Sequence, residues 1–499
     1  MKPEIISLTK PSVCRPNIPS SVGFAVRVLA TIMMFGELAR AEGVDAGFFL
    51  DHFQLTLEDG ERTEAAGPFF YSQRTDAENV LALPPFFSRE RRPAVEFQTR
   101  DYLYPLWTEV DYGREHRWQF LELFSASSGL EPDGDQVRRL TLFPLYFQQR
   151  AADTNLNYTA LAPFYGRLKH RLFRDEIRFL LFPGYVQTRK RDVVTDNYFY
   201  PFVDVRRGDG LTGWQVWPLA GREHKDVTTQ TNGFGDVTVV AGHDQSFYLW
   251  PLYLSQNNGV GTDHPETLRA SIPAFALDRS PQRDSTSVLW PLFAWIDDRD
   301  KQYHEWQGPW PFVIFARGEG KHTSRVWPLF SQSHNATKES DSWLWPLWVF
   351  NRTHSDPLDQ RRTRVLFYLY SRLESKNTET GKARVRLDMW PFFTWRHDFN
   401  GNERLQVLAP LEPAVPDNAG IERNWSPLWS LWRAEQNAAT GAHSESLLWN
   451  LYRRDATPAQ TNVSCLFGLY QSRTRAEAKT TRLFYFPFSR PAAKQGSGQ

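Results

Sequence analysis

The chain has 499 residues, with 58 lysines and arginines against 57 aspartates and glutamates. This near balance excludes the strongly basic surface by which proteins attract nucleic acid, so we expect no nucleic-acid partner. Aromatic residues make up 15% of the chain, with 19 tryptophans and only two cysteines. That composition favours a strand-rich fold that does not depend on disulfides.

Residues 1–41 have the pattern of a secretory signal peptide. Basic residues precede an apolar run at 28–36, and Ala39-Arg40-Ala41 offers small residues for cleavage. The apolar run is too short for a bilayer-spanning helix, which needs about 20 residues. We therefore expect an exported protein, with a β-repeat domain at 42–488 and a disordered tail at 489–499.

A short motif of the form Leu-Trp-Pro-Leu-Phe recurs along the rest of the chain. Its proline, or the residue that replaces it, serves as an index, and the index positions lie 17 to 23 residues apart, except for one interval of 33. The clearest copies contain both a tryptophan and a proline: Trp217-Pro218, Trp250-Pro251, Trp290-Pro291, Trp327-Pro328, Trp345-Pro346 and Trp390-Pro391. Such a fixed period predicts a repeat architecture rather than several unrelated domains.

Between the motifs lie polar segments that contain turn-forming residues, such as Asp209-Gly210 and Asn400-Gly401. Short apolar runs between turn signals predict antiparallel strands joined by hairpins. The sequence therefore predicts an all-β antiparallel meander of about 22 strands in repeats of about 20 residues, one strand for each index position. In this interpretation the motif proline lies in the middle of its strand, and the strand centre is apolar on both faces.

Two architectures would bury both faces of such strands. The first is a large outer-membrane β-barrel, because strands of eight or nine residues, tilted, rise about 20–23 Å, close to the ~25 Å apolar band of these barrels. The second is a β-solenoid or stacked-hairpin array, which the proline favours because it removes a hydrogen-bond donor from the strand ladder. We expect the barrel, with the array as the alternative.

Several stretches resemble an uncharacterised family of exported bacterial proteins with Trp-Pro-Leu-Phe-type β repeats. They are the repeated motif itself, Gly213–Leu219, Thr231–Asp236, Phe399–Arg404 and the run LAPLEP at 408–413. The resemblance implies export and repetition, and it brings no activity, ligand or site residue.

The interval of 33 residues contains a loop insertion at 220–246, where a functional loop would be expected. It holds the candidate metal-ligating residues His224, Asp226, Asp236, His243 and Asp244. Their spacing does not match a compact ligand motif, so a plain surface loop is the favoured interpretation, and we expect no metal and no cofactor.

The chain has no sequence motif of a nucleophilic or metal-dependent enzyme, so we expect a non-catalytic protein. The leading hypothesis is an outer-membrane β-barrel that acts as a pore or translocation conduit in contact with outer-membrane lipid. The alternative is a periplasmic or cell-surface scaffold that binds a polysaccharide or a protein of the envelope. Repeated aromatic side chains could serve as sugar-stacking platforms, although their regular spacing favours a role in the core.

Overall fold

A computed structural model describes residues 46–121, 123–130, 136–231, 237–475 and 478–488. The predicted signal peptide at 1–41, the predicted tail at 489–499 and the candidate ligand Asp236 lie outside the described residues.

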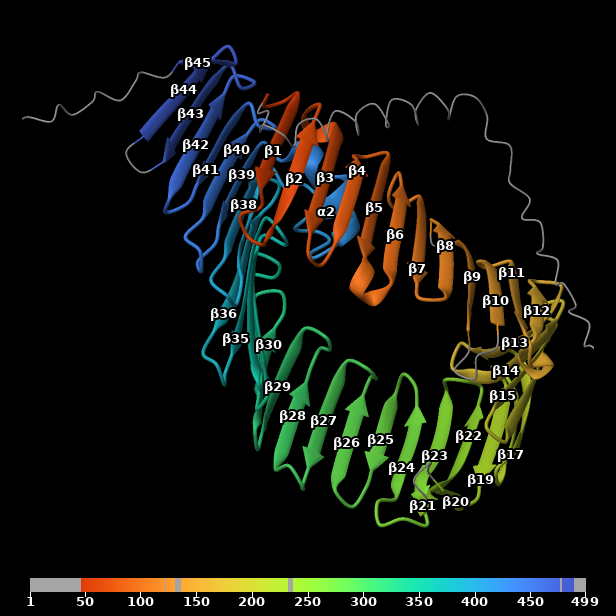
Figure 1. Ribbon diagram of the computed structural model, residues 1–499. Helices are drawn as coiled ribbons and strands as arrows, with labels where there is room; N and C mark the ends of the chain where they lie inside the picture. The colour runs from red at the N-terminus through yellow and green to blue at the C-terminus, as the bar shows by residue number, and fades with distance from the viewer. Residues whose placement is uncertain (1–45, 122, 131–135, 232–236, 476–477, 489–499) are drawn as a thin grey trace, which may run out of the picture.

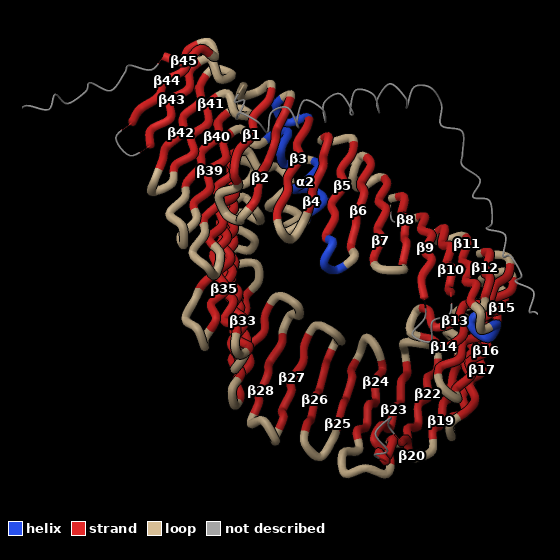
Figure 2. Tube along the Cα trace, viewed as in Figure 1, coloured by secondary structure: helices blue, strands red, loops and turns tan. Residues whose placement is uncertain are grey.

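The structure is almost entirely made of short antiparallel strands (Figures 1 and 2). The first part of the chain forms β1 (Leu50–Gln54), β2 (Gly60–Ala65), β3 (Phe70–Thr75), β4 (Asn79–Leu83), β5 (Phe87–Arg92), β6 (Phe97–Tyr102), β7 (Trp107–Tyr112), β8 (Glu115–Phe120), β9 (Phe124–Leu130), β10 (Gln136–Leu142), β11 (Tyr146–Ala151), β12 (Tyr158–Leu161), β13 (Tyr165–Arg171), β14 (Arg174–Leu180), β15 (Tyr185–Lys190), β16 (Val193–Tyr198), β17 (Val203–Gly208), β18 (Leu211–Val216) and β19 (Ala220–Lys225). The middle part forms β20 (Thr228–Thr231), β21 (Val237–Val240), β22 (Gly242–Tyr248), β23 (Tyr253–Val260), β24 (Glu266–Ser271), β25 (Phe275–Arg279), β26 (Arg283–Val288), β27 (Phe293–Asp298), β28 (Tyr303–Gln307), β29 (Val313–Gly318), β30 (Lys321–Val326), β31 (Phe330–Asn335) and β32 (Lys338–Trp343). The last part forms β33 (Trp348–Ser355), β34 (Leu358–Val365), β35 (Tyr370–Asn377), β36 (Ala383–Met389), β37 (Phe393–His397), β38 (Glu403–Val407), β39 (Trp432–Gln436), β40 (His443–Leu447), β41 (Tyr452–Ala456), β42 (Gln460–Cys465), β43 (Tyr470–Arg475), β44 (Ala478–Leu483) and β45 (Phe486–Phe488).

The few helical segments are short. Two α-helices, α2 (Ala419–Asn424) and α3 (Ser426–Trp429), lie in the connection between β38 and β39, and Figure 2 shows helix beside the first strands of the chain. The described residues also include three single 3-10 turns: η1 (Gly67–Phe69), η2 (Pro93–Val95) and η3 (Thr154–Leu156).

All strands except β20 and β21 belong to one 43-stranded sheet in which each strand pairs with its neighbours in the sequence. The predicted all-β antiparallel meander is therefore confirmed. The expected number of strands is wrong, because each repeat of about 20 residues contributes two short strands instead of one long strand.

The motif is a turn, and its expected place in the middle of a strand is wrong. In the copy at Leu289–Leu292, the amide of Leu292 donates to the carbonyl of Leu289 at 2.8 Å, so Pro291 occupies the third position of a four-residue turn. The peptide bond before Pro291 is cis, as a type VI turn requires. Among the described residues, sixteen X-Pro bonds are cis, and fourteen of them precede an index proline, the exceptions being those before Pro309 and Pro357.

This turn removes the difficulty that a proline would cause in a strand. The third position of the turn needs no N–H donor, so proline costs the ladder nothing there. Neighbouring turns also bond to one another: the amides of Leu344 and Trp345 donate to the carbonyls of Leu329 and Pro328 at 2.6 and 2.8 Å. The hydrogen-bond ladder therefore continues through the turns.

Because strands alternate in direction, all motif turns lie along one edge of the sheet and all polar connections lie along the other. We call these edges the motif rim, made of the connections that contain or adjoin the index positions, and the polar rim, made of the remaining connections. The index positions Pro410 and Pro427 share a single connection on the motif rim, the one that contains α2 and α3.

The two faces of the sheet can be followed through the pairing register, because directly opposed residues point to the same side. One unbroken row runs from Asp51 and Glu64 through Ala160 and Ala294 to Arg433. Small residues are common in this row, and several of them are fully buried. Small side chains are expected on the concave side of a curved sheet, because side chains are crowded there.

The sheet curves until its last strands return beside its first strands (Figure 1). The two ends meet through side chains of this same row: both guanidinium nitrogens of Arg433 on β39 donate to the carboxylate of Glu64 on β2, each at 3.0 Å. Because both ends use the same face, that face is the inner, concave one, and the opposite face is the outer one. We call the contact between β1–β6 and the segment α2–β41 the seam.

Helix α2 lies in the seam. Arg423 donates to Asp101 of β6 at 2.8 Å and pairs with Glu90 of β5, and Trp425, just after the helix, donates to the carbonyl of Tyr104 at 2.8 Å. Among the described residues, β1 pairs only with β2, and β45 pairs only with β44. The ends thus meet by side-chain contacts between faces.

Candidate functional site

The motif rim exposes an unusual amount of apolar surface. In the copy at Leu289–Leu292, the side chains of Leu289, Trp290 and Leu292 are 52, 44 and 41% exposed. The same pattern occurs in the copies at 249–252 and 344–347 and at many other turns. The expectation of a buried strand centre is therefore wrong at these residues, because a turn at the edge of a single-layered sheet has no second layer to cover it.

The aromatic rings of the rim lie against one another from turn to turn. The ring centroids of Trp217 and Trp250, of Phe312 and Trp327, and of Trp327 and Trp345 are each 5.7 Å apart. Aromatic pairs at this distance attract one another beyond the effect of burial alone. The rim is therefore an ordered row of rings and not a set of independent side chains.

The apolar surface continues onto the outer face for one row of residues. Directly opposed pairs in this row include Tyr185 with Tyr198, Trp343 with Trp348, and Met389 with Phe393. The row is apolar or aromatic along most of the sheet. Together with the motif rim it forms what we call the apolar collar.

The next row on the outer face, two residues farther from the rim, is mixed in character. Apolar residues alternate in it with charged ones, among them Arg89, Arg100, Glu109, Arg167, Arg178, Arg222 and Arg269. Successive rows on one face are two residues apart, about 6.6 Å. The apolar collar, counted as the turn and one row, is therefore only about 10 Å high.

The sequence candidates in the interrupted repeat do not form one site. The imidazole of His224 donates to the carboxylates of Asp244 (2.6 Å) and Asp226 (3.2 Å), and these hydrogen bonds raise the pKa of His224. His243 contacts Glu223 at 2.7 Å. Since His224 and His243 come from opposite faces of the sheet by register, they do not share a ligand position.

The insertion consists of a single hairpin beyond two directly paired strands. Strands β19 and β22 pair directly, from Ala220 with Tyr248 to Lys225 with His243, and β20 and β21 form a separate hairpin beyond them. In the described part of the chain, no group of three or more histidine, cysteine, aspartate or glutamate side chains is placed to hold a metal ion.

The tryptophans and prolines of the motif lie together, but as a surface. Trp250, Trp290, Trp345 and Trp390 are all exposed on the rim. The sequence did carry a signal for this arrangement, since a proline within an apolar run argues against a central strand. What the sequence does not show is that the polar segments between motifs are themselves strands.

Over the described ranges, no helix is both long and apolar enough to cross a membrane. No protein-family model matches the chain, and no curated protein is significantly similar to it.

Proposed function

We propose that the protein is non-catalytic and binds edge-on to a lipid bilayer, with its apolar collar inserted into the membrane interface and its polar rim in water. We call the curved sheet in this arrangement the wall. The observation that supports this proposal is the continuous apolar collar along one edge of the sheet. At about 4.8 Å per strand, 43 strands give the collar a length of about 200 Å. Monomeric soluble proteins rarely expose an apolar surface of this extent.

The dimensions of the collar favour lipid over a protein partner. Elements that lie in the membrane interface bury their apolar side about 5–10 Å deep, which matches the collar's height of about 10 Å. Tryptophan and tyrosine, which are frequent in the collar, are also the residues that concentrate at the level of lipid headgroups.

The height of the collar is too small for the membrane-spanning pore that the sequence predicts. A barrel that crosses the membrane needs an outward apolar band of about 25 Å, whereas charged residues such as Arg89, Arg100 and Glu109 interrupt the second outer row here. This supports docking over spanning. In the docked arrangement the inner face of the curved sheet encloses a space next to the bilayer. This arrangement is compatible with a role as a conduit or scaffold at an envelope membrane.

Flotation with vesicles of phosphatidylethanolamine and phosphatidylglycerol tests the proposal. The full chain is expected to float with the vesicles, and a variant with Leu252→Asp, Leu292→Asp and Leu329→Asp is expected to remain at the bottom of the gradient. These three leucines are exposed on the motif rim, so the charges should prevent insertion without disturbing the strands.

The polar rim supplies the matched control. Leu172, Phe173 and Val239 are also exposed apolar residues, but they lie on the opposite side of the wall, and Phe173 is 99% exposed. Their aspartate variants should float as the unchanged protein does. Failure of the unchanged chain to float, or equal loss in both variants, would count against membrane docking. A stable dimer that the rim aspartates dissociate would instead identify the collar as a contact between two copies.

A further inference from the structure

On strands β27, β28 and β29 the second row of the outer face carries aromatic residues. Three aromatic residues stand directly opposite one another on adjacent strands: Trp295 on β27 pairs with Trp306 on β28, which pairs with Phe315 on β29. They belong to the second row on the outer face, outside the apolar collar. Their side chains are 48, 38 and 42% exposed, so they form a surface and not a core.

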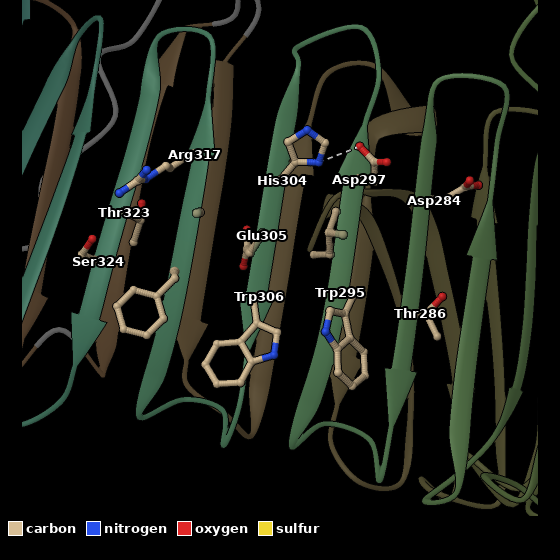
Figure 3. A pocket seen from close by; sticks show the side chains of 13 residues that line it. Asp284, Thr286, Trp295, Asp297, His304, Glu305, Trp306, Arg317, Thr323 and Ser324 are labelled. Atoms are coloured by element: carbon tan, nitrogen blue, oxygen red, sulfur yellow. Dashed lines mark ion pairs between the residues drawn. The ribbon is translucent and has the colours of Figure 1, made fainter.

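The rings lie flat. Figure 3 shows Trp295 and Trp306 side by side, each with the face of its ring turned away from the sheet. The rings of Trp306 and Phe315 are 18° from parallel, with centroids 6.0 Å apart. Three rings on successive strands span about 10 Å, because strands are spaced about 4.8 Å apart. The result is a flat aromatic platform, which we define as Trp295, Trp306 and Phe315.

Polar groups border the platform on three sides. Thr286 and Ser324 continue the row at its two ends, since they are the register partners of Trp295 and Phe315. The next row toward the polar rim contains Asp297, His304 and Arg317, and His304 Nδ1 lies 3.0 Å from an Asp297 carboxylate oxygen. Together with Asp284 these side chains line a shallow hollow over the platform (Figure 3).

Arg317 is a donor without an acceptor among the residues that the structure describes. Its guanidinium is exposed and forms no ion pair with any residue that the structure describes, whereas its register partner His304 is engaged by Asp297. A guanidinium offers five N–H donors in a fixed plane. It is therefore free to bind the hydroxyl or carbonyl oxygens of a ligand that lies on the rings.

We propose that this platform binds an unbranched glycan chain. The apolar faces of pyranose rings stack on flat aromatic rings, and their equatorial hydroxyls need donors and acceptors at the edge of the platform. Successive rings about one strand spacing apart match successive sugar residues of one chain. A lipid-binding surface would be uninterrupted and apolar. This platform is instead bordered by the carboxylates of Asp284 and Asp297, two hydroxyl groups and the guanidinium of Arg317.

Isothermal titration calorimetry of the full chain with cellohexaose and with chitohexaose tests the proposal. At least one of the two is expected to bind saturably, with quenching of tryptophan fluorescence, and Trp306→Ala is expected to weaken binding about tenfold because it removes the central ring. Arg317→Gln should weaken binding by a smaller factor, since it leaves all three rings in place.

Trp214 provides the matched control. It lies in the same outer row and is equally exposed, but its register partners are Val205 and Arg222, so it stands alone. Trp214→Ala should leave glycan affinity unchanged. The absence of saturable binding to either hexasaccharide, or equal loss in the Trp214 and Trp306 variants, would overturn the proposal.

The outcome is independent of membrane docking, because the sugars are soluble and no vesicles are present. If Trp306→Ala abolishes vesicle flotation and leaves no glycan binding to measure, the platform belongs to the membrane-docking surface and the glycan proposal is wrong.

Discussion

At the scale of single residues, Glu64 holds the seam together. Its carboxylate accepts two hydrogen bonds from Arg433 and one from Asn450 at 2.6 Å, and Arg62 lies 2.8 Å from it. Burial alone would raise the pKa of Glu64, but the attraction of Arg433 and Arg62 outweighs burial and holds the pKa well below its usual range. Glu64 is therefore a charged, fully paired group between the two ends of the chain.

Glu64→Gln should lower the free energy of unfolding by about 2–5 kcal/mol, because it leaves buried guanidinium groups without a counter-charge. Urea titration followed by tryptophan fluorescence measures this loss. Asp359→Asn is the matched control, since Asp359 also accepts from two arginines, Arg352 at 2.9 Å and Arg361 at 3.1 Å, but within neighbouring strands. The partly exposed arginines there should limit the cost to about 1 kcal/mol. Equal effects of both substitutions would show that the seam contributes no special stability.

At the scale of elements, the repeat could be predicted from the sequence but its anatomy could not. The period of the index positions and turn signals such as Asp209-Gly210 correctly indicate an all-β meander. The strand count is wrong because strands such as Lys321–Val326 and Lys338–Trp343 are mostly polar, so they lack the apolar pattern by which strands are recognised. Their stability comes from pairing on both sides within a continuous sheet.

Pro328 illustrates the same limit. A proline amid apolar residues is compatible with a bulged strand or with a tight turn, and the flanking Trp327 and Leu329 suit either. The choice depends on whether the neighbouring polar segments pair, which is a property of the whole sheet. The seam was also beyond sequence reasoning, since Glu64 and Arg433 are 369 residues apart.

The β20–β21 hairpin should be dispensable for the fold. The sheet already continues from β19 to β22 without it, and the hairpin forms a separate two-stranded sheet. Replacing residues 228–240 with Asn-Gly should therefore change the free energy of unfolding by no more than about 0.5 kcal/mol. Urea unfolding of this variant provides the measurement.

Deleting β30 and β31 as residues 321–335 is the contrasting variant. It removes a pair of strands from the continuous sheet and shortens the wall by about 10 Å. This moves the docked ends out of register, so stability should fall clearly. If removal of β20–β21 is as damaging as removal of β30–β31, the hairpin has a structural role that its pairing does not reveal.

At the scale of the whole molecule, the two rims and the seam have separate roles. The collar is apolar because turns of one composition repeat along one edge. The curvature is closed by polar contacts between inner faces, including Arg433 with Glu64 and Arg423 with Asp101. A closure made of ion pairs responds to pH, whereas an apolar collar does not.

The seam should therefore open in acid while the sheet itself persists. The pKa of Glu64 is lower in the folded chain than in the unfolded chain, where it is about 4.3. Its contribution is fully present above that value and is lost progressively as the pH falls toward the folded-state pKa. The separation of the ends can be measured by pulsed electron–electron double resonance between two spin labels. The labels are attached at Asp59→Cys and Ala439→Cys, in a chain in which Cys14 and Cys465 are changed to serine.

These label positions lie in turns that touch across the seam, since Asn437 donates to the carbonyl of Thr56 at 3.1 Å. A short distance is expected at pH 7, and a longer one should appear progressively as the pH is lowered below about 4, with circular dichroism still typical of strands. Glu64→Gln should show the longer distance already at pH 7, because the charge that acid would remove is absent. An unchanged short distance in both experiments would mean that the ends are held by the apolar and backbone contacts of α2 and not by the ion pairs.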